Sequence, residues 1–290
     1  MIKEIAVISG KGGTGKSSVT AAFATLNGNR VVLADCDVDA ANLHIIMEPE
    51  IEFSDIYVSG EKAVIDYDKC SICGVCQEYC RFNAISFTDG KYLIDDISCD
   101  GCRLCERVCP AKAISMEKSD KSRMHSGTFR NGKMVYGRLE PGEENSGKLV
   151  AMVRNKCREI ADESDIETIL IDSPPGIGCS VISSISGVNY VLVVTEPSLS
   201  AKSDLDRTLE LLENYDVKKG VVINKYDLSY EITDKVVDFC NSRGVELIGK
   251  IPFDPEVVEA MVNRKSVVEW NPHSKISKEI INIWEKITQQ

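Results

Sequence analysis

Short apolar runs alternate with helical patterns along most of the chain. The runs are rich in Val, Ile and Leu and are bounded by polar residues or glycine, which predicts buried strands at 4–9, 30–34, 168–171, 190–195, 220–223 and 246–250. Apolar residues at helical spacing predict helices over 18–26, 149–161 and 199–215. Because strands that alternate with helices are typical of an α/β fold, we expect a mostly parallel, doubly wound sheet.

The regular alternation is interrupted between residues 59 and 118. We therefore expect residues 1–58 and 119–290 to form one domain, and 59–118 to form a smaller α+β domain inserted in one of its surface connections. After the insertion, Asn131 and Gly132 separate two short β-rich runs. This pattern predicts a two-residue β-hairpin that projects near the insertion, with a loose linker as the alternative.

Composition limits the kinds of protein that this sequence can encode. The 290 residues are 43% hydrophobic and 27% charged, which is typical of a globular protein with a large core. No apolar stretch approaches the roughly 20 residues of a membrane span, and the N-terminus shows no signal peptide, so we expect a cytoplasmic protein without a membrane partner. The net charge of −11 disfavours a nucleic-acid partner. An apolar stripe along 274–288 fits a membrane-binding foot or, as we favour, a helix packed on the sheet.

Residues 10–17 have the sequence of a P-loop, placed between an apolar strand and a helical run. Its backbone N–H groups would form a nest for phosphate oxygens, Lys16 would reach the β- and γ-phosphates, and the Ser17 hydroxyl would bind Mg²⁺. The nucleotide-binding residues predicted in this segment are Gly10, Lys11, Gly12, Gly13, Thr14, Gly15, Lys16, Ser17 and Ser18.

Carboxylates at two strand ends complete the predicted nucleotide site. Asp172 follows the apolar run 168–171 and is expected to hold Mg²⁺ through water, as a Walker B aspartate does. Asp35 and Asp37 follow the second strand, and both are candidates for positioning the attacking water. Of these two residues we favour Asp37.

Eight of the twelve cysteines lie in residues 70–109, in two copies of the spacing C-x-x-C-x-x-C-x-x-x-C. The second copy follows the first by 29 residues, so the segment is a duplicated structural unit. In bacterial ferredoxins with this spacing, thiolates hold [4Fe-4S] clusters and the fourth cysteine of each run serves the other cluster. We therefore expect two clusters, one held by Cys70, Cys73, Cys76 and Cys109 and the other by Cys99, Cys102, Cys105 and Cys80.

Structural zinc is the alternative for these cysteines, but zinc sites usually have paired C-x-x-C segments. One departure from the ferredoxin pattern concerns the residue after each run. Pro110 follows the second run, as the pattern requires, whereas Arg81 follows the first. This change is expected to alter the turn and the electrostatics near one cluster without removing a ligand.

The residues around the P-loop resemble one family of nucleotide-binding proteins. The additional lysine, Lys11, is similar to the deviant Walker A signature of the MinD, ParA and Mrp group, and the segments 35–43 and 172–176 resemble its switch I and switch II. A nucleotide domain interrupted by a two-cluster ferredoxin resembles the MinD-type ATPases with an inserted ferredoxin domain. The resemblance implies a homodimer bridged by ATP, or a dimer with a close paralogue, in which Lys11 reaches the partner's phosphates as a catalytic residue.

Two motifs bear on the nucleotide base. Residues 224–227 have the pattern N-K-x-D, by which GTPases select guanine through the aspartate, here Asp227. In the family that this chain resembles, the asparagine that matches Asn224 contacts adenine, and a loop like 251–254 lines the other side of the base. The resemblance thus implies Pro252 and Asp254 as further contacts, and we expect ATP, with GTP as the alternative.

Four cysteines lie outside the two runs. Cys157 and Cys240 fall in helical patterns and are expected to be small buried side chains. Cys36 and Cys179 lie in and beside the two switch segments. For these two we expect inert packing, with a metal or cluster that bridges two subunits as the alternative.

These features lead to three hypotheses for the function. In the first, the chain is an ATPase whose nucleotide state controls electron transfer through two [4Fe-4S] clusters to a partner, with ATP and Mg²⁺ as further cofactors. In the second, it is an ATPase that assembles or carries iron–sulfur or other metal clusters for a client, although it lacks the C-terminal C-x-x-C of Mrp-type carriers. The third is a positioning ATPase with structural clusters.

Overall fold

The chain divides into two units in the computed structural model, which describes residues 2–130, 132–143 and 145–289. The first unit contains Met1–Ser54, Met124–Gly137 and Ser146–Gln290, and the second contains Asp55–Arg123 and Arg138–Asn145. The segment 59–118 lies within the second unit, which also includes a short segment from later in the sequence. The chain therefore passes between the two units four times.

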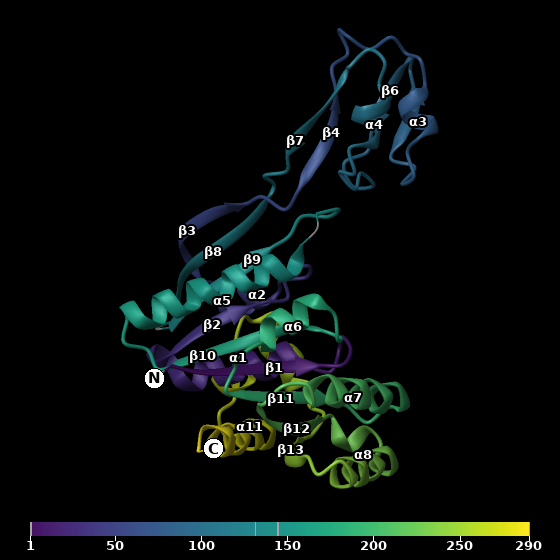
Figure 1. Ribbon diagram of the computed structural model, residues 1–290. Coiled ribbons are helices and arrows are strands. Elements are labelled where there is room, and N and C mark those ends of the chain that lie inside the picture. The colour runs from purple at the N-terminus through teal and green to yellow at the C-terminus, as the bar shows by residue number, and fades with distance from the viewer. Residues whose placement is uncertain (1, 131, 144, 290) are drawn as a thin grey trace. The chain divides into compact units, whose positions relative to one another are not determined.

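A nine-stranded sheet forms the centre of the first unit (Figure 1). The seven strands from β13 to β9 pair in parallel, and β8 and β3 complete the sheet. The order across the sheet is β13 (Glu246–Ile251), β12 (Lys218–Asn224), β11 (Tyr190–Thr195), β1 (Lys3–Ser9), β10 (Thr168–Pro175), β2 (Val31–Asp35), β9 (Gly132–Arg138), β8 (Ser122–Phe129) and β3 (Glu50–Tyr57). The six predicted strands are all present, and the prediction of an α/β fold with a mostly parallel sheet is confirmed.

Helices cover both faces of this sheet. Ile5 and Val7 of β1 belong to a core that they share with α1 (Lys16–Asn27), α10 (Val267–Trp270) and α11 (Lys275–Thr288). Ala6 and Ile8 point to the other face, because side chains alternate along a strand, and they are also fully buried. Three helices contact the sheet strands from that side: α5 (Ser146–Glu163), α6 (Cys179–Ile185) and α7 (Leu199–Leu212). The remaining helices of the unit are η1 (Gly28–Arg30), α2 (Leu43–Met47), η2 (Tyr226–Leu228), α8 (Tyr230–Ser242) and α9 (Glu256–Val262).

The predicted hairpin corresponds to β8 and β9, which are consecutive in sequence and adjacent in the sheet. Of its two turn residues, Asn131 lies outside the described residues. The expectation that the hairpin projects from the fold is wrong, because β9 pairs in parallel with β2, for example at Val32 and Lys133. This pairing satisfies backbone groups that would otherwise be left open at the edge of β2.

The apolar stripe of the last predicted helix faces the protein interior. In α11 the side chains of Ile276, Ile280, Ile283 and Ile287 are all at most 2% exposed, so the expectation that this helix packs on the sheet is confirmed. Within the described residues, no helix combines the length and the apolar character that a bilayer crossing requires.

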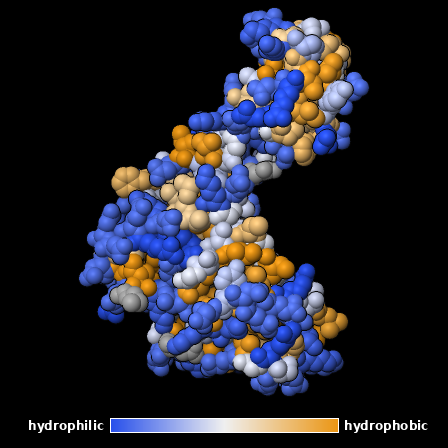
Figure 2. Space-filling model, viewed as in Figure 1, coloured by the Kyte–Doolittle hydropathy of each residue, from blue (hydrophilic) through white to orange (hydrophobic). Residues whose placement is uncertain are grey.

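The second unit is small and contains two antiparallel strand pairs. β4 (Glu61–Ile65) pairs with β7 (Ile114–Lys118), and β5 (Ile85–Thr88) pairs with β6 (Lys91–Ile94). Two short helices, α3 (Val75–Glu78) and α4 (Leu104–Val108), begin 29 residues apart, like the two cysteine runs. Figure 2 shows hydrophobic side chains on the surface of this unit, where Ile72, Phe82, Phe87 and Ile97 are between 43% and 64% exposed.

Candidate functional site

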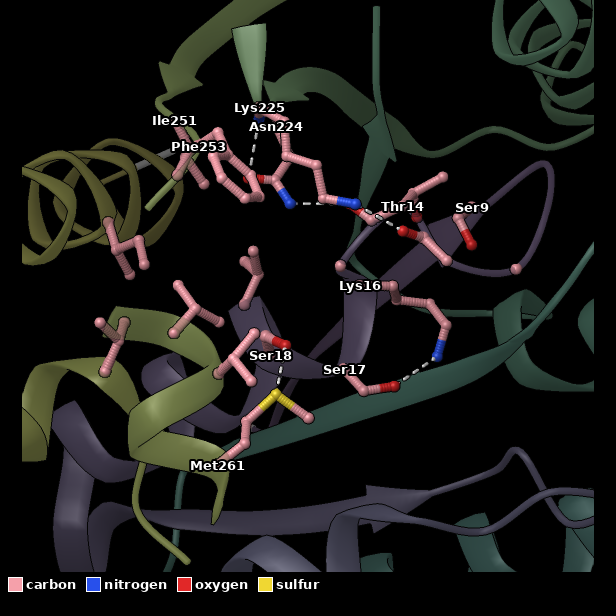
Figure 3. Close-up of a pocket in the computed structure, with 18 of the residues that line it drawn as sticks. Ser9, Thr14, Lys16, Ser17, Ser18, Asn224, Lys225, Ile251, Phe253 and Met261 are labelled. Atoms are coloured by element: carbon pink, nitrogen blue, oxygen red, sulfur yellow. Dashed lines mark hydrogen bonds between the residues drawn. The ribbon is translucent and has the colours of Figure 1, made fainter. Parts of the chain in front are cut away.

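The loop between β1 and α1 lines a cavity of about 490 Å³ (Figure 3). Gly13 and Gly15 in this loop have positive φ angles of 82° and 88°, which residues other than glycine rarely adopt. A side chain at Gly15 would also collide with Asn224, because a Cβ atom there would stand 2.2 Å from the Asn224 amide nitrogen. Gly13 and Gly15 are therefore needed for this backbone path, and Gly15 also for the close approach of β12.

Asp172 lies behind the P-loop, where it contacts two residues that line the cavity, Lys16 and Ser17. It is fully buried in β10, and its carboxylate pairs with the Lys16 amino group at 2.8 Å. The same carboxylate accepts hydrogen bonds from the hydroxyls of Ser17 at 2.7 Å and Thr20 at 2.9 Å. The fold thus brings together the three residues predicted for phosphate and Mg²⁺ binding, whereas the contribution of Thr20 was not predicted.

The donor set at the P-loop end of the cavity fits a magnesium nucleotide. Mg²⁺ prefers oxygen ligands, and the Ser17 hydroxyl lies beside the Asp172 carboxylate. Two further hydroxyl oxygens, those of Thr14 and Ser173, are buried and have no hydrogen-bond partner among the described residues. Because buried polar atoms are nearly always paired, unpaired hydroxyls in the P-loop and next to Asp172 are consistent with a polar ligand at this site.

The two aspartates after β2 have different surroundings. Asp35 is fully buried, and its carboxylate oxygens accept hydrogen bonds from the backbone N–H groups of Asp37 at 3.2 Å and Leu43 at 3.1 Å. Burial and the nearby Asp172 charge raise the pKa of Asp35 to about 8. Asp37 lines the cavity, and burial raises its pKa too. Asp35 therefore organises the turn after the strand, and Asp37 faces the space that a nucleotide would occupy.

Lys11 is held by residues that follow β11. Its amino group pairs with Glu196 at 2.7 Å and donates to the hydroxyls of Ser198 and Ser200, each at 3.1 Å. Glu196 also lies 3.4 Å from the Lys225 amino group. Partial burial opposes ionisation of Glu196, but its contacts with Lys11 and Lys225 outweigh burial and lower its pKa. None of the three residues around Lys11 was predicted, although β11 is the neighbour of β1 and both strands end at the same edge of the sheet.

The far end of the cavity is suited to a nucleotide base. Of the residues predicted to contact the base, Asn224, Pro252 and Asp254 line the cavity, together with apolar side chains such as Ile251. Figure 3 shows Ile251 and Phe253 across the cavity from Lys16 and Ser17. The Asn224 amide donates to the Thr14 carbonyl at 2.8 Å, which joins this end to the P-loop.

Asp227, the aspartate of the N-K-x-D pattern, has a different position. It is not among the residues that line the cavity. One of its carboxylate oxygens accepts a hydrogen bond from the backbone N–H of Phe253 at 2.7 Å. Its observed role is therefore to hold the 251–254 loop that forms one wall of the base end.

The eight clustered cysteines line two small cavities in the second unit. One cavity is lined by Cys80, Cys99, Cys102 and Cys105, and the other by Cys70, Cys73, Cys76 and Cys109. Each cavity therefore combines three cysteines from one run with the fourth cysteine of the other run. Among the described residues, no group of three or more His, Cys, Asp or Glu side chains is arranged to hold a single metal ion.

The remaining cysteines divide into buried and exposed positions. Cys36, Cys157 and Cys240 are fully buried, and burial raises the pKa of each thiol. Inert packing is the simplest account of these three residues. Cys179 is exposed at the start of α6.

Comparison with known proteins agrees with this description. Residues 5–267 match the family described as CobQ/CobB/MinD/ParA nucleotide binding domain. An uncharacterized protein of Methanocaldococcus jannaschii is 32% identical over 300 residues, which cover 100% of this chain and 98% of that protein. The iron-sulfur cluster carrier protein of Aquifex aeolicus is 26% identical over 140 residues, or 43% of this chain and 38% of the carrier.

A solved structure shows the same fold. The septum site-determining protein MinD complexed with Mg-ADP from Pyrococcus horikoshii superposes with a TM-score of 0.60 and 20% identity, over 99% of this chain and 96% of that one. The family match covers most of the chain, including the P-loop, Asp37, Asp172 and Asn224. The chain therefore belongs to the CobQ/CobB/MinD/ParA nucleotide-binding family and is a P-loop ATPase of the MinD/ParA type.

Proposed function

We propose that this ATPase couples ATP binding and hydrolysis to electron transfer through two [4Fe-4S] clusters in its second unit, toward a partner protein. The observation that carries the proposal is the pair of four-cysteine cavities, each built from both cysteine runs. An exchange of the fourth cysteine between runs is what two-cluster ferredoxins use to hold their clusters. The ferredoxin identity of the insertion is part of this proposal.

The chemistry of the cavities supports clusters over a single ion. In a cubane each thiolate binds a different iron atom, so the four sulfurs stand farther apart than they would around one zinc ion. When bound, such clusters would supply one-electron oxidation and reduction, which the ordinary side chains of this chain do not provide.

In the proposed ATPase cycle, the described contacts have specific roles. Lys16 would neutralise the β- and γ-phosphates, and Ser17 and Asp172 would hold Mg²⁺, which would help to neutralise the phosphate charge. Asp37 positions the attacking water. In an ATP-bridged homodimer, Lys11 leaves Glu196 and contacts the phosphates of the partner subunit. Asn224, Pro252 and Asp254 surround adenine.

The proposed electron path needs a donor and an acceptor outside this chain. A one-electron carrier protein would reduce a cluster, and a redox client protein would take up the same electron after transfer through the second unit. The exposed hydrophobic side chains of that unit support contact with another protein, because large exposed apolar surface often marks an interaction site.

The metal content of the protein tests the cluster proposal. Purified without oxygen, the full chain should contain about eight iron and about eight sulfide, because each cubane has four of each. Cys70→Ser and Cys99→Ser should each remove or convert one cluster and leave ATP binding intact. Cys179→Ser is the matched control, because this exposed cysteine lies outside both cavities. Zinc in place of iron after anaerobic reconstitution would refute the proposal.

A second candidate function is the assembly or delivery of clusters. It is favoured by the similarity to the iron-sulfur cluster carrier protein of Aquifex aeolicus, which lies over less than half of this chain. The two functions differ in the fate of iron. A reductase keeps its iron through repeated rounds of ATP hydrolysis with a client, whereas a carrier loses iron to the client in proportion to the cluster transferred.

A further inference from the structure

The two cysteine sets come from a duplication, but one lysine breaks the equivalence between them. Lys62 and Lys91 occupy equivalent positions, since they lie 29 residues apart like the cysteine runs. Lys62 lies in β4 and is half-buried, whereas Lys91 lies in β6 and is exposed. The Lys91 amino group is 5.5 Å from the centre of the Tyr67 ring. The same residue type therefore has two different environments in the two halves of the unit.

Lys62 contacts the backbone of a cluster cysteine. Its amino group donates hydrogen bonds to the carbonyl oxygens of Cys99 and Gly142, each at 2.6 Å. Within the described parts of the chain, no carboxylate forms an ion pair with Lys62. A positive charge is thus held, partly shielded from water, beside the set formed by Cys80, Cys99, Cys102 and Cys105.

Other charges near the two sets are more exposed or are paired. Arg103 lines the same cavity as Cys99, but it forms ion pairs with Glu61 and Glu106, and the acidic Asp100 also lines that cavity. Near the other set, Lys69 is paired with Asp66. Exposed charges are screened by water and salt, so Lys62 is expected to make the larger difference between the sets.

The exposure of the cysteines to water does not offset this difference. Cys73 and Cys102 occupy equivalent positions and are both exposed, but the equivalent pair Cys76 and Cys105 differs, since Cys76 is buried and Cys105 is half-buried. Solvent exposure is one of the factors that set the potential of an iron–sulfur cluster, together with net charge and hydrogen bonds. The deeper burial of Cys76 disfavours added negative charge on its cluster, so this difference acts in the same direction as Lys62, and the Lys62 variants separate the two contributions.

We propose that Lys62 raises the reduction potential of the cluster held by Cys80, Cys99, Cys102 and Cys105 above that of the other cluster. The inference rests on the proposed function, because it requires both clusters. Reduction adds one negative charge to a cluster, and a partly buried positive charge nearby stabilises the reduced form. With both clusters bound, one electron would pass from the cluster held by the Cys70 set, which would be oxidised, to the cluster held by the Cys99 set, which would be reduced. Lys62 acts as a positioning and tuning residue and is not a ligand.

Anaerobic redox titration of the full chain, followed by electron paramagnetic resonance, tests this proposal. The wild-type protein should show two separate potentials, and the Cys99→Ser variant should lose or alter the signal with the higher one. Lys62→Met should lower that potential and leave the other unchanged. Lys62→Arg should retain the wild-type value, since it keeps the charge. Lys91→Met is the matched control and should shift neither potential.

Several outcomes would overturn the proposal. If the two clusters of the wild-type protein had equal reduction potentials, the proposal would be wrong. This measurement needs no variant, so the test remains valid even if Lys62→Met fails to assemble both clusters. When the iron content of Lys62→Met matches that of the wild type, two further outcomes would contradict the proposal. Either both potentials are unchanged, or both shift by the same amount. A wild-type protein without iron–sulfur clusters would instead contradict the proposed function.

Discussion

At the scale of single residues, the nucleotide site depends most on Asp172. One buried carboxylate holds the Lys16 amino group and the hydroxyls of Ser17 and Thr20. Lys16 is itself only 6% exposed, so the pair is shielded from solvent. Removing one partner of such a pair leaves a buried charge without compensation, which is strongly unfavourable. The side chains proposed to bind phosphate and metal are thus held in place by contacts within the protein.

The two P-loop lysines should respond differently to substitution. We expect Lys16→Ala to abolish ATP binding, because Lys16 supplies the charge that faces the phosphates. The Lys11→Ala variant should bind ATP normally but should not form the ATP-dependent homodimer. Its rate of ATP hydrolysis should fall by about 10³-fold or more, as when an arginine finger is removed. Calorimetric titration, sedimentation and phosphate release measure the three quantities. Lys202→Ala, which alters a lysine outside the cavity, serves as the control.

A monomeric Lys11→Ala variant with normal turnover would show that Lys11 has no role across the subunits. The contact with Glu196 is no obstacle to such a role. The Lys11 and Glu196 side chains are 28% and 19% exposed, so solvent reaches the pair. On moving, Lys11 would give up this pair and its hydrogen bonds to Ser198 and Ser200, and contact with anionic phosphate would offset the loss.

At the scale of elements, the loops after β12 and β13 together form the base end of the cavity. Asp227 follows β12 and bonds to the Phe253 backbone after β13. Asp227→Ala should weaken ATP and GTP binding alike, by about tenfold, because a hydrogen bond to a charged group is worth roughly 1.5–3 kcal/mol and water recovers part of it. Competition binding with both nucleotides measures this effect.

Asp227→Asn is the matched variant for this prediction. An asparagine keeps an oxygen that can accept the Phe253 N–H bond, so ATP binding should change little. If Asp227 instead selected guanine, as the N-K-x-D pattern would have it, Asp227→Asn would weaken GTP binding alone. That result would show that the protein binds GTP through Asp227 and would contradict the assignment of ATP as its nucleotide.

Elements that are buried on both faces could be predicted from the sequence. In β1, for example, Ile5 to Ile8 are all fully buried and form an unbroken apolar run. β3 was missed, because Ile51, Phe53 and Ile56 are more than half exposed and its pattern marks no buried face. The cysteine sets were predictable from local spacing. The contact between Lys11 and Glu196 joins residues far apart in the sequence and depends on which strands are neighbours, which spacing alone does not specify.

At the scale of the whole molecule, two chain segments connect the nucleotide site to the second unit. The segment after Asp37 runs through α2 and β3 into the second unit at Asp55. The other segment leaves the second unit at Asn145 and begins α5, where Gly147 packs close to the Cys179 backbone after the 172–176 loop. A rearrangement of the first switch segment therefore has a direct covalent route to the unit that carries the cysteines, and the second switch segment has a route through the packing of Gly147 near Cys179.

We expect the cluster potentials, or the rate of electron transfer to a partner, to differ between ADP and a non-hydrolysable ATP analogue. By linkage, reduction should change nucleotide affinity by the same free energy with which the nucleotide changes the potential. Anaerobic redox titrations with each nucleotide measure the effect, and Lys16→Ala should show none. Equal potentials and equal rates in both states would favour a carrier or structural role for the clusters.

The four passages of the chain between the units also have a consequence for protein engineering. The second unit is not a single cassette, because Arg138–Asn145 belongs to it as well as Asp55–Arg123. A graft of the longer segment alone would leave Gly142 behind, and with it one of the two carbonyl groups that bind Lys62. A transplanted unit would have to include both segments. If a protease cut the chain at Arg138, the second unit would still be joined to the first unit at the other three crossings.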